Sequence, residues 1–235
     1  EYKNNKFSEE EARRIRYDFF ESVVYKYNAK YLFTAHHGDD LIETVLMRLT
    51  RGSTFKGYSG ISTITKKDKY DIVRPLIFLT KQEVMDYIEK NHIPYVIDNS
   101  NTSLKYTRNR YRANILPILK QENKKVHQKF YKYSKIIEDY DNFVNNYVNK
   151  IYDKIVIDHK INLDEFLKED ELIKHIILER YIYSVYGDDI VCWDDTKTNI
   201  LMDLAEYNKP NIQIDLPNNI KGIKEYNLLY KEVQY

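Results

Sequence analysis

The sequence of 235 residues is long enough for one large domain or two small ones. Its 43% hydrophobic residues can form a core, and its 23 tyrosines and 9 phenylalanines argue against an intrinsically disordered chain. The single cysteine, Cys192, excludes an intrachain disulfide and a cysteine-rich metal site, and no apolar run reaches the roughly 18 residues of a membrane span. We therefore expect a cytoplasmic protein without a membrane partner.

The formal net charge of +1 hides an uneven distribution of charge along the chain. Residues 1–103 carry 16 basic and 15 acidic side chains, residues 104–135 carry 10 and 1, and residues 136–235 carry 11 and 20. Phosphate binding depends on local clusters of Lys and Arg rather than on the overall charge. Residues 104–135, here called the basic segment, are therefore the candidate for contact with nucleic acid.

The first predicted helix follows a capping box at Ser8–Glu11 and continues to about Tyr27. Its apolar residues recur at helical spacing, which is typical of a helix that covers a sheet.

The stretch from Tyr31 to Thr44 has the pattern of a buried strand that runs into an amphipathic helix. A polar cluster falls at the turn between them: His36, His37, Asp39, Asp40 and Glu43. In parallel α/β sheets this turn lies at the carboxyl edge of the strands, where ligands bind. Three carboxylates beside two imidazoles suit Mg²⁺ or an ammonium group, although Asp39 alone is more typical of a helix cap.

The middle of the chain alternates loops with short elements. Arg51–Gly60 is a glycine-rich loop, and the runs at 61–65 and 70–73 predict a β-hairpin. Thr80–Glu83 is a second capping box, for a helix that ends near Asn91, and Asp98–Ser103 is a polar loop.

A helix from Thr107 carries Arg108, Arg110 and Arg112, and Pro117 should divide it before a boundary at Asn123. Arg108 and Arg112 share a face that can meet the site, while Arg110 points elsewhere, toward an RNA backbone. The alternative is a solvated basic helix.

From Val126 to Ile151 the apolar and aromatic residues recur every three or four positions, which predicts a long amphipathic helix. Such an aromatic stripe is more often core than a base-stacking surface. The acidic remainder predicts three further helices and terminal strands at 213–216 and 220–233, with no catalytic constellation after residue 120.

Five motifs between residues 8 and 119 resemble, in the expected order, those of the tRNA(Ile)-lysidine synthases. They are His36–Thr44, Arg51–Gly52, Arg74–Leu76, Asp98–Asn101, and Arg108–Arg112 with Leu116–Pro117. The resemblance implies an α/β fold: a partial, Rossmann-like domain of the N-type ATP pyrophosphatases, also called PP-loop enzymes, followed by a mainly helical domain. We expect residues 1–120 to be the C-terminal part of the catalytic domain and 121–235 to bind tRNA or substrate.

The resemblance also implies a reaction. ATP adenylates the C2 oxygen of the wobble cytidine in a tRNA(Ile) with a CAU anticodon, and the ε-amine of L-lysine then displaces AMP to give lysidine. By the family pattern, Asp40 and Glu43 hold the lysine amino groups, Arg112 its carboxylate or a developing phosphate charge, and His36 and Arg108 the nucleotide. His37 and Asp39 are weaker candidates for proton transfer or for a metal such as Mg²⁺. The tRNA contacts expected are Arg110, Lys105, Lys124, Lys125 and Lys129.

One family feature is missing from the sequence. The Ser-Gly-Gly-x-Asp-Ser loop that holds the ATP pyrophosphate does not occur, since no two of the six glycines are adjacent. We therefore expect an internal fragment of a longer protein, and for the isolated chain a non-catalytic tRNA-binding module is an alternative to an enzyme. A related tRNA thiolation enzyme is a second alternative, although it needs paired cysteines. The sequence leaves open whether the chain forms a homodimer.

Overall fold

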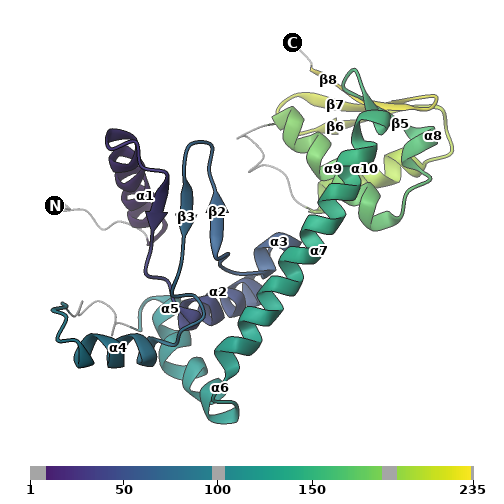
Figure 1. Ribbon diagram of the computed structural model, residues 1–235. Helices are drawn as coiled ribbons and strands as arrows, with labels where there is room; N and C mark the ends of the chain where they lie inside the picture. The colour runs from purple at the N-terminus through teal and green to yellow at the C-terminus, as the bar shows by residue number, and fades with distance from the viewer. Residues whose placement is uncertain (1–8, 97–103, 187–194, 234–235) are drawn as a thin grey trace. The chain divides into compact units, whose positions relative to one another are not determined.

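The computed structural model describes residues 9–96, 104–186 and 195–233 (Figure 1). The chain divides into two compact units, residues 1–140 and 141–235, each described here by itself. This division falls inside a long helix rather than at the predicted domain boundary after residue 120, which stays a prediction. Among the described residues, no helix combines the length and the apolar character that a transmembrane segment requires.

The first unit is built from helices around a small sheet. Its elements are α1 (Glu9–Lys26), β1 (Tyr31–Phe33), α2 (Gly38–Arg51), α3 (Phe55–Tyr58), β2 (Ile64–Lys66), β3 (Asp71–Val73), α4 (Lys81–Lys90), α5 (Thr107–Arg110), η2 (Tyr111–Ile115), α6 (Leu116–Glu122) and the start of α7 (Val126–Ile155). The predicted helices are all present, and Thr80 and Glu83 form the expected capping box of α4. The cap expected at Ser8 lies outside the described residues.

The sheet of the first unit has the strand order β1-β3-β2. β1 and β3 are parallel, with Leu32 opposite Ile72, whereas β2 and β3 form the predicted antiparallel hairpin. Val24 of α1 packs with Ile72, so α1 covers this sheet as expected.

The prediction that β1 is buried was wrong, since Tyr31 is 55% and Phe33 65% exposed. In the described part of the chain β1 pairs only with β3, so it is an edge strand with one face uncovered.

α2 is the buried helix of the first unit. Leu41, Ile42 and Val45 are almost fully enclosed, and they pack against Ile77 after β3 and against Leu116 and Val126 of α6 and α7. Gly60 supports this packing because its backbone has a φ of +80° and a Cβ there would come within 2.7 Å of the Val45 side chain. The α2 axis is therefore fixed from several sides, which also fixes the polar residues at its start.

The helical segment from Thr107 to Glu122 has one wide π-helical turn, η2, in which the Leu116 N–H donates to the Tyr111 carbonyl. Pro117 follows at the start of α6; it has no N–H to donate and its ring would crowd the preceding turn of a regular helix. The predicted break at Pro117 therefore takes the form of a π turn, and α6 ends at Glu122 with Asn123 as its C-cap, at the expected boundary.

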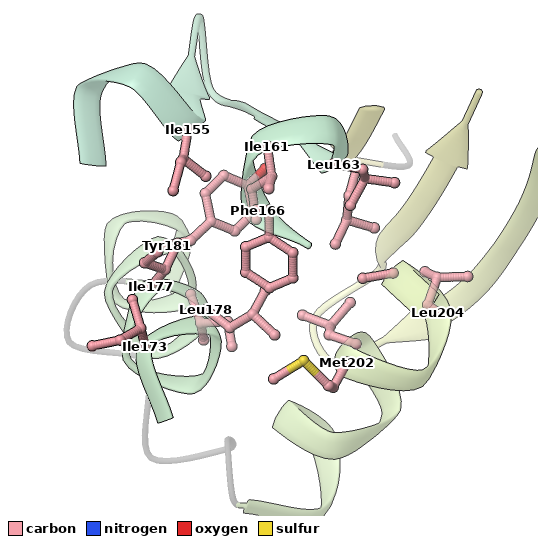
Figure 2. Close-up of a cluster of buried hydrophobic side chains, with 14 of the residues drawn as sticks. Ile155, Ile161, Leu163, Phe166, Ile173, Ile177, Leu178, Tyr181, Met202 and Leu204 are labelled. Carbon is pink, nitrogen blue, oxygen red and sulfur yellow. The ribbon is translucent and has the colours of Figure 1, made fainter. Parts of the chain in front are cut away.

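The second unit combines helices with a five-stranded sheet of order β4-β5-β8-β7-β6. Its elements are the end of α7, β4 (Val156–Ile157), β5 (Lys160–Asn162), α8 (Leu163–Phe166), α9 (Glu171–Tyr186), α10 (Asp195–Glu206), β6 (Asn211–Leu216), β7 (Ile220–Glu225) and β8 (Leu228–Val233). Figure 2 shows its core, in which Phe166 and Leu178 are completely enclosed among side chains from α7, α9 and α10. Its sheet is larger than predicted, because β4 and β5 are too short to give a periodic pattern.

Candidate active site

The polar cluster predicted from the sequence lies where the chain leaves β1 and enters α2. The Thr34 N–H still pairs with the Val73 carbonyl, and α2 begins four residues later at Gly38. His37, rather than Asp39, is the N-cap residue: its Nδ1 accepts from the Asp40 N–H, and the Asp40 carboxylate accepts from the His37 N–H at 3.0 Å. The prediction of Asp39 as the cap was therefore wrong, because a histidine ring nitrogen takes that role.

Asp40 and Glu43 share one face of α2, as their spacing predicted, and both contact Arg112. Arg112 forms a bidentate pair with Glu43, with Nε 2.7 Å from Oε1 and Nη2 2.9 Å from Oε2. The same Nη2 lies 3.3 Å from an Asp40 oxygen. Residues 69 or more positions apart in the sequence are thereby joined into one cluster.

Arg108 completes this cluster from the neighbouring turn of α5. Its Nη2 donates to the Thr44 hydroxyl at 2.8 Å, and its Nε lies 3.3 Å from Glu43 Oε2 without the alignment of a hydrogen bond. Thr44 Oγ1 in turn donates to the Asp40 carbonyl. The predicted shared face of Arg108 and Arg112 therefore meets the acidic face of α2.

Burial gives the two carboxylates different properties. The Glu43 side chain is fully enclosed, whereas 14% of the Asp40 side chain is exposed. Burial raises the pKa of Glu43, and the hydrogen bonds from Arg112 oppose that rise; the hydrogen bond to Glu43 in turn raises the pKa of Arg112. Glu43 is therefore paired with the guanidinium groups of Arg108 and Arg112, and Asp40 is the carboxylate that a ligand can reach.

His36 lies at the same edge of the sheet. Its Nδ1 is 2.8 Å from the Thr34 hydroxyl. Burial lowers its pKa to about 4; nearby Asp40 raises the pKa, while Arg74, Arg13 and Arg108 lower it further. His36 is therefore a neutral hydrogen-bonding group at neutral pH.

Asp39 is buried one turn before Glu43 on α2 and pairs with Lys120 of α6, whose Nζ lies 2.6 Å from Oδ2. Its other oxygen, Oδ1, has no hydrogen-bond partner among the described residues. Within the described ranges no three His, Cys, Asp or Glu side chains gather as metal ligands. The metal role of Asp39 therefore stays a prediction, and one oxygen of its carboxylate is already paired with Lys120.

In the folded chain, ion pairs neutralise part of the positive charge of the basic segment. Four of its ten cations pair with carboxylates: Arg108, Arg112, Lys120 and Lys135. Arg110 donates to the Leu104 and Lys105 carbonyls and to the Thr107 hydroxyl, so it holds its own loop. The side chains of Lys105, Lys124, Lys125 and Lys129 are exposed, as a role in phosphate contact requires.

Sequence reasoning missed two residues of the site. Thr44 connects Arg108 to α2, and Lys120 neutralises Asp39. The motif at Asp98–Asn101 lies outside the described residues. Arg74, which belongs to a third motif, is buried and donates to the Ser62 carbonyl and to the Thr65 hydroxyl, so it ties β3 to the β2 strand.

Comparison with known proteins identifies the first part of the chain. The family model of the PP-loop domain matches residues 1–119. The chain is 36% identical over 226 residues, 94% of its length, to the bifunctional protein TilS/HprT of Listeria monocytogenes. It is 33% identical to the tRNA(Ile)-lysidine synthase of Geobacillus kaustophilus over 93% of the chain, and 31% identical to that of Bacillus subtilis over 92%.

These similarities confirm the resemblance inferred from the motifs, and the PP-loop family implies the use of ATP. The chain spans only 35% of the Listeria protein, 48% of the Geobacillus protein and 47% of the Bacillus protein. The family model, in contrast, covers about half of the chain itself, and the polar cluster from His36 to Arg112 lies within it. The chain therefore belongs to the PP-loop domain family.

Proposed function

We propose that this chain forms part of a tRNA(Ile)-lysidine synthase, in which ATP activates the wobble cytidine and L-lysine then replaces AMP. The observation that carries the proposal is the convergence of Asp40 and Glu43 with Arg108 and Arg112, side chains from two separate motifs, at the start of α2. Similarity over more than nine tenths of the chain to proteins with this name supports it.

The geometry suggests different tasks for the two carboxylates. Asp40 is partly exposed, and its charge suits the ammonium group of a bound lysine. Glu43 is enclosed, so we assign it to holding Arg108 and Arg112 in place. Arg112 presents a planar guanidinium beside Asp40, where it suits the lysine α-carboxylate or a developing phosphate charge.

The remaining contacts concern the nucleotide and the RNA. His36 is neutral at physiological pH, so we assign it a hydrogen bond to the nucleotide, beside the positive charges of Arg74 and Arg108. ATP supplies the adenylyl group that makes the cytidine oxygen a leaving group. We assign phosphate contacts of the tRNA to the exposed Lys105, Lys124, Lys125 and Lys129.

A tRNA-binding role without catalysis by the isolated chain is a second candidate, and one observation favours it. The sequence contains no pair of adjacent glycines that could form the phosphate-holding loop of the family. Titration of ATP against the chain separates the two, because a tRNA-binding module binds tRNA without binding ATP.

The proposed roles are tested by Asp40→Asn and Glu43→Gln in the gene product that contains this chain. We expect each to raise the KM for lysine more than the KM for ATP, Asp40→Asn through lost contact with the ammonium group and Glu43→Gln through misplaced arginines. The measurement is the formation of lysidine in a tRNA(Ile) transcript, followed by mass spectrometry of the nucleosides. Asp203→Asn, an exposed change on α10, is the matched control. Unchanged lysine kinetics in both variants would contradict the assignment.

A further inference from the structure

Part of the aromatic stripe on α7 is exposed rather than packed, contrary to the expectation that it forms core. Within the first unit Tyr133 is 36%, Ile136 42% and Tyr140 60% exposed. The opposite side of the helix makes the packing contacts: Phe130 packs against Ile42 and Val126, and the Ser134 hydroxyl donates to the Ser59 carbonyl. Among the described residues this helix face is therefore only partly covered, most openly at Tyr140.

The exposed rings continue a row of lysines on the same face. Lys125, Lys129 and Lys132 are exposed and are spaced four and three residues apart. At about 100° per residue, these lysines and the residues Tyr133, Ile136 and Tyr140 fall within a sector of roughly 100° around the helix. We call this surface the lysine–tyrosine stripe.

We propose that the lysine–tyrosine stripe binds RNA with unstacked bases, the lysines contacting phosphates and Tyr133 and Tyr140 stacking on bases. The inference deepens the tRNA part of the proposed function and rests on it. Charge complementarity selects RNA as the occupant, because no acidic side chain lies among the exposed lysines of this face between Lys125 and Lys132. An aromatic ring beside a phosphate contact is the arrangement by which proteins hold single-stranded nucleotides.

The spacing suits a looped strand rather than a duplex. Lys129 and Tyr133 are one helical turn apart, about 6 Å along the axis, so one nucleotide can meet both. Tyr133 and Tyr140 are two turns apart, about 10 Å, which is too far for two bases that stay stacked on each other. Paired bases cannot present their faces to the rings, so the stripe should discriminate against double-stranded RNA.

The test uses Tyr133→Leu/Tyr140→Leu, a double change that keeps an apolar, helix-compatible side chain but removes the rings. We expect the affinity for tRNA(Ile) and for a single-stranded RNA oligonucleotide to fall at least about fivefold for each ring lost. The dependence of the affinity on salt should stay as in the parent chain, because the rings release no counterions. Tyr133→Phe/Tyr140→Phe should retain the affinity, and Tyr183→Leu/Tyr207→Leu, exposed tyrosines of the second unit, should have no effect.

The outcomes separate this inference from the proposed function. If the parent chain binds the oligonucleotide through the two rings but does not select tRNA(Ile), the stripe stands and the proposed function fails. If tRNA(Ile) binds and the leucine variant binds equally well, the stripe is wrong. Equal binding of double-stranded RNA of the same length by the parent chain also overturns the inference. So does a leucine variant that changes its oligomeric state but binds RNA as the parent does, because the face would then be a contact between copies of the chain.

Discussion

Two adjacent histidines between β1 and α2 have different hydrogen-bond partners. His37 caps α2 through Nδ1, which must be unprotonated to accept the Asp40 N–H, so a neutral His37 carries its proton on Nε2, 3.4 Å from the Asp40 carboxylate. His36 lies beside three arginines and is partly buried, which makes its protonated form unfavourable. His36 is therefore suited to hydrogen bonding without charge.

We expect His36 to stay neutral down to about pH 5 and to titrate near pH 4, because burial lowers its pKa to about 4. NMR of the imidazole carbons measures this directly, with His36→Gln to assign the signal. The unfolded chain binds this proton near pH 6.5 and the folded chain only near pH 4. The contribution of His36 to the free energy of unfolding is therefore full above pH 6.5 and is lost as the pH falls toward 4.

Thr34→Val is the matched variant for this titration. Burial is the main cause of the low pKa, so loss of the Thr34 hydroxyl should leave the titration well below pH 6.5. A His36 signal that titrates near 6.5 in the parent chain would contradict the arrangement of this edge of the sheet.

The π turn η2 determines which side chains of the segment 107–122 reach α2. Arg108 and Lys120 are twelve residues apart and would differ by about 120° around a regular α-helix. The extra residue that a π turn accommodates reduces this difference to about 20°. Arg108, Arg112 and Lys120 can then all meet carboxylates of α2, as their ion pairs with Glu43, Asp40 and Asp39 show.

Lys120→Met should lower the free energy of unfolding by about 2 kcal/mol, because it leaves the buried Asp39 carboxylate without its charge partner. This is less than for a fully enclosed pair, since the Lys120 side chain is 34% exposed. Urea denaturation of the chain measures the change. Lys120→Arg should restore most of the loss.

A double-mutant cycle with Asp39→Asn distinguishes the pair from a general packing effect. If Lys120→Met costs as much in the Asp39→Asn variant as in the parent, the Asp39–Lys120 ion pair contributes nothing. The expected result is that the second change costs much less once the first is present.

The sequence predicts the elements with clear local signals. Thr80 and Glu83 mark the start of α4, and the break at Pro117 was expected. The shared faces of Asp40 with Glu43 and of Arg108 with Arg112 follow from helical spacing alone. The pairing of Lys120 with Asp39 does not, because its position depends on an unforeseen π turn. The exposure of Phe33 and Tyr140 also depends on which neighbouring elements are present, and periodicity carries no information about that.

At the scale of the whole chain, the basic segment and most of the acidic residues that follow it belong to different units. The exposed lysines of the basic segment belong to the first unit, whereas residues 141–235, the second unit, carry 11 basic and 18 acidic side chains. RNA phosphates should therefore be attracted to the first unit. Binding by counterion release makes this attraction measurable as a salt dependence.

We expect replacement of Lys124, Lys125 and Lys129 by Ala to weaken the salt dependence of tRNA binding. If all three lysines contact phosphates, the slope of log affinity against log salt should become less steep by about two to three units. Filter binding of tRNA(Ile) at several salt concentrations measures the slope.

The matched control is a triple replacement of exposed lysines in the second unit, Lys150, Lys154 and Lys209. It removes the same formal charge from the chain, so a change in net charge alone would affect both variants equally. Lys224 is unsuitable as a control because it is buried and donates to the Ala205 carbonyl in the last turn of α10, so its loss would disturb the fold. Equal slopes in the parent, the Lys124/Lys125/Lys129 variant and the control would show that the basic segment is only a solvated helix surface and that the phosphates are bound elsewhere.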